Sequence, residues 1–214
     1  MNDLTAVDVL VNPDETTLEH ARAWNARMRE SVPDGFALDT SHQPHITTLQ
    51  CYVRTTDLDD AYDAVHRTLA ATDTSALSYQ AVAIRHADWG VPGQGLAVIL
   101  LRPGQRVIDF QAALLAAISP FTESGGTAAA FVTDPGEAIS QSTLDWVGGY
   151  IPAQIGPDRY TAHITVGFAT LDDLTAIEAE PFDAFTVRPA AVAVYQLGNS
   201  GAARKLLRSW PAPN

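Results

Sequence analysis

The feature that most constrains the fold of this chain is an internal repeat of about 100 residues, and each half contains the tripeptide His-Ile-Thr. The two copies run from His45 to Thr47 and from His163 to Thr165. From the frequencies of histidine, isoleucine and threonine in this chain, about 0.03 copies of the tripeptide are expected by chance. Two copies at matching places in the repeat therefore predict a duplicated architecture.

Each half has the same predicted order of elements: strand, helix, motif strand, helix, strand. Leu18, Ala21, Trp24 and Met28 recur at helical spacing, and Thr16 or Thr17 can cap that helix. In the first half the elements are expected at residues 4–11, 16–30, 45–53, 57–71 and 78–86. In the second half they are expected at residues 96–102, 105–119, 161–169, 171–178 and 186–197.

Two further features support and qualify the repeat. The segment 81–84, Ala-Val-Ala-Ile, matches the segment 191–194, Ala-Val-Ala-Val. Residues 120–160 form a long insertion that only the second half contains, and loops of this length are usually functional or disordered. Within the insertion, Gln141 to Tyr150 has the pattern of a short amphipathic helix.

Composition restricts the class of partner. The formal charge is −12, with 25 acidic residues against 13 basic ones, whereas proteins that hold long nucleic acids usually have a basic face. A local group of arginines can still bind one phosphate, so small phosphoesters and oligonucleotide ends remain candidates. The alternative is that the acidity only keeps the protein soluble.

The remaining composition bears on location. Cys51 is the single cysteine, which excludes an intramolecular disulfide, and the first residues lack the pattern of a secretory signal. Apolar runs such as Leu96 to Leu101 are shorter than the roughly 20 residues of a membrane helix. We therefore predict a cytoplasmic protein with no membrane partner.

The tripeptide itself suggests acid/base chemistry on a phosphate. In a strand, residues i and i+2 share one face, so each histidine emerges beside its threonine. Histidine titrates near neutrality as acid or base, and threonine hydroxyls can donate hydrogen bonds to phosphate oxygens. The intervening isoleucines, with Val166 and Phe168, are expected to face the helices. The alternative is that each tripeptide merely belongs to a half-buried strand.

A family resemblance rests on residues 43–47 (Gln-Pro-His-Ile-Thr), 160–167 (Tyr-Thr-Ala-His-Ile-Thr-Val-Gly) and 194–198 (Val-Tyr-Gln-Leu-Gly). In these segments the chain resembles the two-histidine (2H) phosphoesterase superfamily, close to bacterial proteins known as 2′-5′ RNA ligases or RNA 2′,3′-cyclic phosphodiesterases. Thr48 departs from the family pattern, which has an apolar residue there, whereas Val166 conforms.

The resemblance implies an α+β, duplicated bilobal fold, with two antiparallel sheets lining a central cleft and helices packed outside. The chain would be a single domain, with lobe 1 at about 1–90, lobe 2 at about 91–214, and terminal segments that can cross between lobes. It further implies catalytic roles for His45, Thr47, His163 and Thr165 with no metal and no cofactor. Which histidine is the acid stays open.

Other residues are weaker candidates. Arg159 and Tyr160 are candidates for substrate binding. Arg159 shares strand parity with His163 if that strand starts early, and the alternative is a solvated surface arginine. Tyr160 can stack on a base or pack in the core. His42 precedes His45 by three residues, but no nearby Cys, Asp or Glu completes a metal site. Further aromatic side chains that can either stack on a base or pack in the core are Phe36, Trp146 and Tyr150.

The sequence thus predicts a metal-independent phosphodiesterase that acts on 2′,3′-cyclic phosphates or on 2′-5′ linked nucleotides and RNA ends. Its partner is expected to be a small nucleotide or an oligonucleotide end, and the protein is expected to be a monomer. The first alternative is a non-catalytic module that binds cyclic or terminal phosphates. The second is a metal hydrolase that uses His42 and His45.

Overall fold

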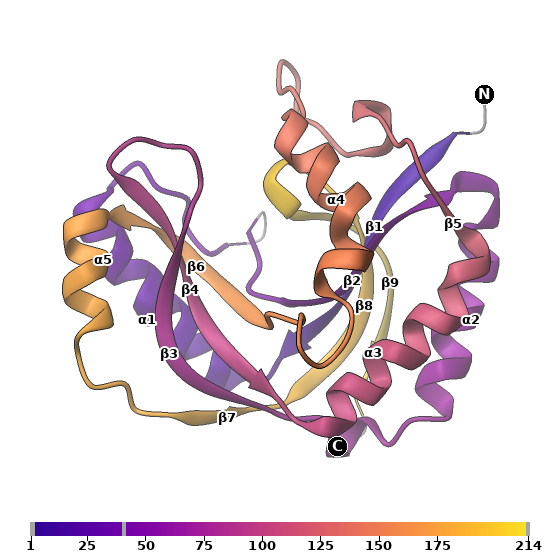
Figure 1. Ribbon diagram of the computed structural model, residues 1–214, viewed down its shortest axis with the longest axis horizontal. Coiled ribbons are helices and arrows are strands. Elements are labelled where there is room, and N and C mark those ends of the chain that lie inside the picture. Colours follow the sequence, from indigo (N-terminus) through magenta and orange to yellow (C-terminus); the bar gives the residue numbers. More distant parts are fainter. Residues whose placement is uncertain (1–2, 40–41, 213–214) are drawn as a thin grey trace.

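Two antiparallel sheets form the centre of the molecule, and most of the helices cover their outer faces (Figure 1). The structure is a computed structural model that describes residues 3–39 and 42–212. The five-stranded sheet, here sheet A, has the strand order β5-β2-β1-β8-β9. The four-stranded sheet, here sheet B, has the order β6-β4-β3-β7. The predicted α+β class with two antiparallel sheets is confirmed.

The strands agree closely with the positions expected from the sequence. The strands of sheet A are β1 (Leu4–Pro13), β2 (Ile46–Arg54), β5 (Thr122–Glu123), β8 (Pro189–Leu197) and β9 (Ala203–Pro211). The strands of sheet B are β3 (Tyr79–Asp88), β4 (Gln94–Pro103), β6 (His163–Thr170) and β7 (Phe185–Val187). The last predicted strand is thus divided into β7 and β8, which belong to different sheets. The strands β5 and β9 were not predicted.

The five α-helices are α1 (Glu15–Ser31), α2 (Leu58–Ala70), α3 (Gln105–Ile118), α4 (Gln141–Gln154) and α5 (Leu171–Glu178). Three of them have a side-chain N-cap, in which Asp14, Ser140 or Thr170 accepts a hydrogen bond from a backbone N–H of the first turn. The cap of α1 is therefore Asp14, not the predicted Thr16 or Thr17. Short 3-10 turns lie at Thr55–Asp57, Thr74–Ala76, Ser119–Phe121, Ala128–Ala130 and Asn199–Gly201.

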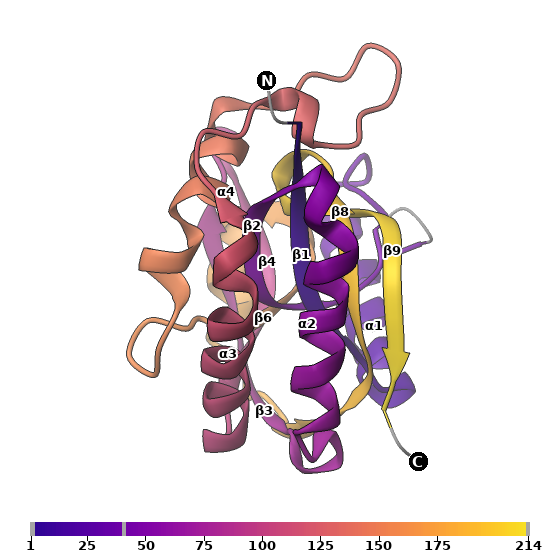
Figure 2. The same ribbon diagram turned by 90° about the vertical axis from the view of Figure 1, so that its right-hand side faces the viewer.

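Each sheet combines strands from both halves of the sequence. The third strand of the first half, β3, pairs with β4, and the last long strand of the second half, β8, pairs with β1. The helices are exchanged too: α1 lies against β6, whereas α3 lies beside α2 behind sheet A (Figure 2). Internal strands and helices, and not only the terminal segments, therefore pack with elements of the other half of the sequence. The predicted lobe boundary near residue 90 stays a prediction.

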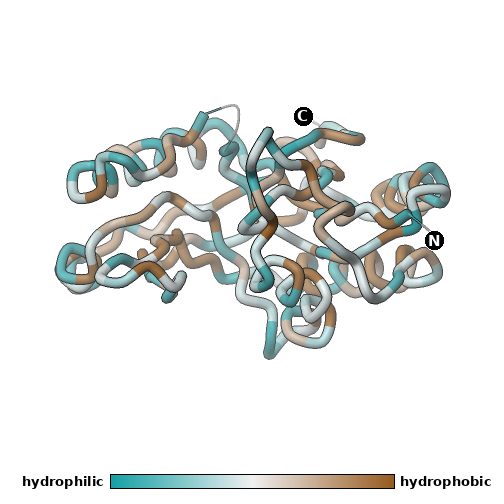
Figure 3. The backbone as a smooth tube through the Cα atoms, turned by 90° about the horizontal axis from the view of Figure 1, so that it is seen from above, coloured by the Kyte–Doolittle hydropathy of each residue, from teal (hydrophilic) through white to brown (hydrophobic). Residues whose placement is uncertain are grey.

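The core lies between each sheet and its outer helices. Val7 and Val9 of β1 line one small cavity together with Val65 of α2 and Ile118 of α3, which shows that they face the helices. In Figure 3 the strands are mostly brown or pale, while the helices alternate teal and brown, as expected for helices with one apolar face. The opposite side chains of β1, Ala6, Asp8 and Leu10, lie on the inner face of sheet A.

The insertion at 120–160 is mostly ordered into elements. It contains β5, the turn at Ala128–Ala130 and α4, which is longer than the short helix expected over Gln141–Tyr150. Phe131 and Val147 of the insertion pack against Ala6 and Tyr52, so the insertion covers part of the inner face of sheet A. No helix in the described part of the chain is long and apolar enough to cross a membrane.

Candidate active site

The two His-Ile-Thr segments occupy equivalent places in β2 and β6. Thr47 pairs with Leu10 of β1, and Thr165 pairs with Val98 of β4. In both strands the residue after the threonine, Thr48 or Val166, is the extra residue of a β-bulge. The repeat therefore extends to a backbone irregularity three residues after each histidine.

Each histidine is held by its own backbone in the same way. The Nδ1 atom of His45 lies 2.8 Å from the carbonyl oxygen of Gln43, and that of His163 lies 2.8 Å from the carbonyl oxygen of Thr161. Because a carbonyl oxygen only accepts hydrogen bonds, Nδ1 must carry the proton in both rings. The Nε2 atom of each ring is left to accept or donate a proton.

The β-bulges are held from outside by two buried amides. Asn25 of α1 donates from Nδ2 to the carbonyl oxygen of Val166 at 2.9 Å. Gln111 of α3 donates from Nε2 to the carbonyl oxygen of Thr48 at 3.1 Å. Each amide comes from the opposite half of the sequence to the bulge that it holds. The bulge frees a carbonyl from the strand ladder, so a buried donor at this point satisfies it.

The bulge in β6 also corrects one prediction. Phe168 pairs with Leu96 of β4, one position beyond the pair of Gly167 and Ala97, so it faces the inner side and not the helices. The extra residue Val166 shifts the alternation of side chains by one. Phe168 packs edge-on against Phe36 of the loop after α1, with ring centroids 5.6 Å apart. The other expected residues, Ile46, Ile164 and Val166, are fully buried as predicted.

Gly167 follows the bulge in a conformation that favours glycine, with φ of 137°. A Cβ atom there would lie 3.0 Å from Nδ2 of Asn25 and 3.2 Å from Cβ of Met28. The glycine therefore allows α1 to approach the motif strand closely enough for Asn25 to reach the bulge.

The first His/Thr pair lies beside a buried carboxyl group that the sequence analysis did not single out. Asp8 of β1 is 0% exposed, and its Oδ2 atom accepts hydrogen bonds from Thr47 Oγ1 at 2.7 Å and from Gln50 Nε2 at 2.9 Å. The same oxygen lies 4.0 Å from Nε2 of His45. The hydroxyl of Thr165, in contrast, makes no side-chain hydrogen bond to any described residue.

The protein shifts the pKa values of this site in opposite directions. Burial raises the pKa of the Asp8 carboxyl, while the charge of His45 and the bonds from Gln50 and Thr47 oppose the rise. Burial lowers the pKa of the His163 imidazole, the hydrogen bond to Thr161 opposes this, and the charge of His45 adds to it. The strands that carry the two rings, β2 and β6, contact each other, and the charge of His45 acts on His163.

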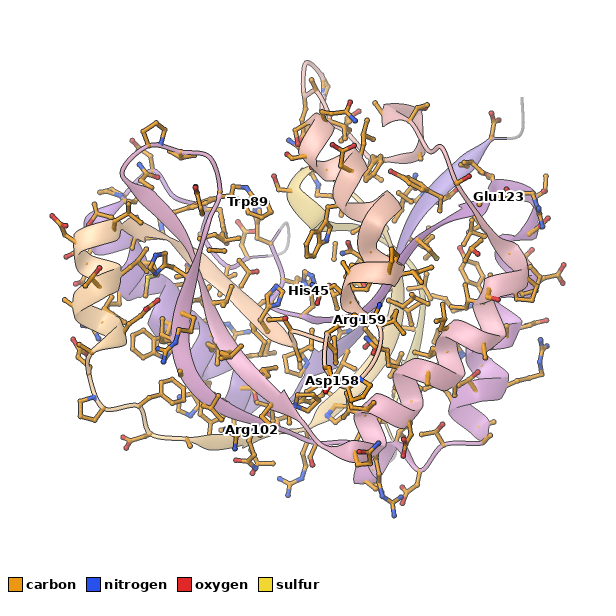
Figure 4. The ribbon with its side chains drawn as sticks, viewed as in Figure 1. His45, Trp89, Arg102, Glu123, Asp158 and Arg159 are labelled. Carbon is orange, nitrogen blue, oxygen red and sulfur yellow. The ribbon has the colours of Figure 1, made fainter. Side chains whose placement is uncertain are left out.

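The weaker candidates have diverse environments. Arg159 is exposed on the segment that follows α4, labelled in Figure 4, and donates to the carbonyl oxygen of Pro152 at 2.7 Å. Tyr160 is buried, and its hydroxyl donates to the carbonyl oxygen of Thr47 at 2.7 Å, which links the segment before β6 to β2. Tyr160 thus positions the first motif strand.

The other aromatic and sulfur-containing candidates also differ. Trp146 is 42% exposed, whereas Tyr150 is buried in the core. Phe36 stacks on His42 with ring centroids 4.9 Å apart. Cys51 is buried, and burial together with the charge of Asp8 raises the pKa of its thiol to about 12. Of these, Trp146 alone presents a large ring to solvent.

The described residues contain no group of three His, Cys, Asp or Glu side chains placed to hold a metal ion. His42 lies beside Asp39, with Nδ1 and Oδ1 3.8 Å apart, and its ring stacks on Phe36. His42 and His45 therefore have different partners, Asp39 and Asp8 respectively. The absence of a metal from the reaction stays a prediction.

Three residues of this site, Asp8, Asn25 and Gln111, were not predicted from the sequence, although each is a polar residue at a position where apolar ones are expected. Asp8 is the one charged residue in the apolar run of β1. Asn25 and Gln111 occupy buried positions of their helices, where most neighbours at helical spacing are apolar. Polar side chains on faces that must be buried need partners, and this requirement marks them as candidates.

Comparison with known proteins gives fold-level similarity only. No family model and no curated protein sequence matches the chain. Among solved structures, E. coli LigT complexed with 3′-AMP is 11% identical over 99% of both chains, with a TM-score of 0.49. Usb1 of Kluyveromyces marxianus with uridine monophosphate is 9% identical over 97% of this chain and 98% of that one, with a TM-score of 0.47. Because both scores lie below 0.5, the proposals below rest on the site geometry.

Proposed function

We propose that this chain is a two-histidine phosphodiesterase that opens 2′,3′-cyclic phosphates or cleaves 2′-5′ linkages at nucleotide or RNA ends. The observation that carries the proposal is the matched pair of Nδ1 hydrogen bonds at His45 and His163. They leave two Nε2 atoms, one per repeat, as the proton-transferring atoms of a single site. Hydrolysis of a phosphodiester requires this combination of one base and one acid.

The proposed reaction uses both rings at once. One Nε2 removes a proton from the attacking water, and the other donates a proton to the departing ribose oxygen. The free hydroxyl of Thr165 can donate to a non-bridging oxygen of the phosphate, where negative charge must be stabilised. Thr47 stands at the equivalent place in the first repeat, and its hydroxyl donates to Asp8. No step requires a metal ion, which keeps the proposal metal-independent.

The substrate is proposed to be small. The formal charge of −12 disfavours a long phosphate backbone, whereas a single phosphate needs only local donors. Arg159 is the proposed cation for a phosphate next to the scissile one, because it is exposed and, within residues 3–39 and 42–212, its side chain donates a hydrogen bond only to Pro152. A cytoplasmic location and a monomeric state remain predictions of the same proposal.

The test is a turnover screen with nucleoside 2′,3′-cyclic phosphates, ADP-ribose 1″,2″-cyclic phosphate, 2′-5′ dinucleotides and RNA with cyclic ends. On the best substrate, His45→Ala and His163→Ala should each lower turnover by about two to four orders of magnitude. The double variant should lose much less than the product of the single losses, because the two groups act as a unit. His66→Ala is the matched control, since His66 is exposed on α2 and stacks on Trp210.

Two outcomes would redirect the proposal. If either single variant kept nearly full activity, the paired site would be wrong. If the native protein bound these compounds and formed no product, the chain would be a phosphate-binding module, which is the alternative function. A preparation that lost activity with EDTA and regained it with zinc or manganese would instead support a metal hydrolase.

A further inference from the structure

The two His/Thr pairs are alike in backbone geometry but differ in the groups behind them. In sheet A, the second residue pair from the bulge, on the side away from Thr47, is Asp8 and Gln50. In sheet B, the pair at the same offset from the bulge is Leu96 and Phe168. The first repeat therefore has a carboxyl group and an amide where the second has two apolar side chains. The site is asymmetric in its electrostatics.

The carboxyl group of Asp8 acts on the first pair alone. Its Oδ2 atom binds the Thr47 hydroxyl at 2.7 Å and lies 4.0 Å from Nε2 of His45. At 4.0 Å the imidazole feels the carboxylate charge but keeps its Nε2 proton available to another acceptor, because this distance exceeds that of a hydrogen bond. A carboxylate at this place favours a proton on the neighbouring imidazole without taking up that proton in a hydrogen bond.

The groups around Asp8 leave His45 as its cationic partner. The charge of Asp8 raises the pKa values of Cys51 of β2 and Tyr150 of α4, and Tyr195 of β8 pairs with Asp8 across the sheet. Burial raises the pKa of all three, so they stay neutral through the neutral pH range. Among the described residues, His45 is the basic side chain that the structure places within 4.0 Å of Asp8.

The second histidine has the opposite environment. Burial lowers the pKa of His163, and its nearby titratable group is His45, whose positive charge lowers it further. The apolar Leu96 and Phe168 provide no carboxylate to offset these effects. His163 is therefore the imidazole that stays neutral when one proton is present in the pair of rings.

We propose that Asp8 is a positioning residue that holds the proton of His45, which makes His45 the general acid and His163 the general base. The inference rests on the proposed phosphodiesterase function. In the reaction, the attacking water gives a proton to His163 Nε2 as its oxygen bonds to phosphorus. The bond from phosphorus to the ribose oxygen breaks, and that oxygen takes the proton from His45 Nε2. One water is consumed, and proton exchange with solvent restores both rings.

The acid and the base are distinguished by changing the leaving group. A nitrophenolate leaves without protonation, so a nucleotide p-nitrophenyl phosphodiester does not need the acid, whereas a nucleoside 2′,3′-cyclic phosphate does. On the cyclic phosphate, His45→Ala and His163→Ala should each lose about two to four orders of magnitude in kcat/KM. On the nitrophenyl ester, His45→Ala should lose less than about 10-fold, whereas His163→Ala should keep its full loss.

Asp8→Asn should affect kcat/KM on the two substrates in the same direction as His45→Ala does. On the cyclic phosphate, the alkaline limb of the kcat/KM profile should move to lower pH, because the variant lacks the carboxylate that lies beside the acid. The acidic limb should stay in place, and on the nitrophenyl ester the substitution should have little effect. The control is Asp57→Asn, which removes a carboxylate that pairs with Arg54 away from the motifs.

The outcomes separate this inference from the proposed function. A loss on the nitrophenyl ester for His45→Ala and not for His163→Ala would reverse the roles and overturn the inference, while the phosphodiesterase function would stand. Equal changes of both limbs in Asp8→Asn would give Asp8 a purely structural role and also overturn it. If Asp8→Asn does not fold, the two histidine variants still decide the roles. Absence of turnover on every phosphodiester would overturn the function itself.

Discussion

Gln111 offers a direct test of the idea that buried amides set the geometry of the motif strands. Its Nε2 donates to the carbonyl oxygens of Thr48 and Gln154, at 3.1 and 3.2 Å, and its Oε1 accepts from the backbone N–H of Gly156 at 3.2 Å. One side chain thus joins the bulge of β2 to the end of α4. Gln111→Met keeps the length and the helix propensity while it removes all three bonds.

The expected loss of stability follows from where the three backbone groups lie. The hydrogen bond to the Thr48 carbonyl is buried. Its loss leaves that carbonyl oxygen without a donor, which should lower the free energy of unfolding by about 1 to 3 kcal/mol. Gln154 and Gly156 are partly exposed and can bond to water, so each loss is nearer the net value of about 0.5 to 1.5 kcal/mol. The apolar methionine recovers part of this by burial, which leaves about 2 to 4 kcal/mol.

The measurement is equilibrium unfolding in urea, with an unchanged m-value as the check that the midpoint reports stability. The control is Gln105→Met, on the same helix, because Gln105 is exposed and bonds only Asp109 in the next turn. That control should stay within about 0.5 kcal/mol of the native protein. In folded samples, Gln111→Met should also reduce turnover by about 10- to 100-fold, because the His45 strand loses its support.

Equal stability of Gln111→Met and Gln105→Met would show that the bonds of Gln111 do not stabilise the fold. Loss of stability with native turnover, measured where Gln111→Met is fully folded, would contradict only its effect on the active site. In that case the amide would hold the fold without setting the position of His45.

Three further predictions concern metal, backbone and charge. Exhaustive chelation should leave turnover unchanged, as measured before and after addition of zinc or manganese. Gly167→Ala should lower the free energy of unfolding by about 1 to 3 kcal/mol through backbone strain, whereas Gly149→Ala, in open space on α4, should be neutral or stabilising. Burial raises the folded-state pKa of Asp8 above the ordinary value of an aspartate, about 3.9. The native protein should therefore lose stability relative to Asp8→Asn as pH rises from about 4 to the folded-state pKa, and should lose no more above it.

Local structure was predictable because local patterns determine it. The helix α5 begins and ends at the predicted residues, and the other predicted elements are within a few residues of their expected ends. Apolar periodicity and turn residues act within one element and need no knowledge of its neighbours. The strand β9 was missed since its run from Ala203 to Pro211 mixes Arg, Lys and Ser with few buried side chains, which is typical of an edge strand.

Strand pairing was not predictable in the same way. A repeat predicts that the two halves resemble each other, but it does not determine whether each half closes on itself or exchanges its last strand. The exchange of β3 and β8 depends on long-range register between apolar faces. Phe168 shows the same limit at a single residue, because a bulge at Val166 reverses the face that alternation would predict.

The pair of histidines was predictable, but the difference between them was not, and that difference is what a reaction with one acid and one base requires. Duplication supplies two equivalent rings with the same Nδ1 hydrogen bond. Two rings in identical surroundings would have the same affinity for a proton, so neither would be favoured as the acid or as the base. One polar substitution on the inner face, Asp8 in place of an apolar residue such as Leu96, removes the equivalence without disturbing the strands that carry the rings. In the proposed reaction, the backbone of the repeat places the two rings at the phosphate, and the difference between their neighbouring side chains determines which ring is the acid and which is the base.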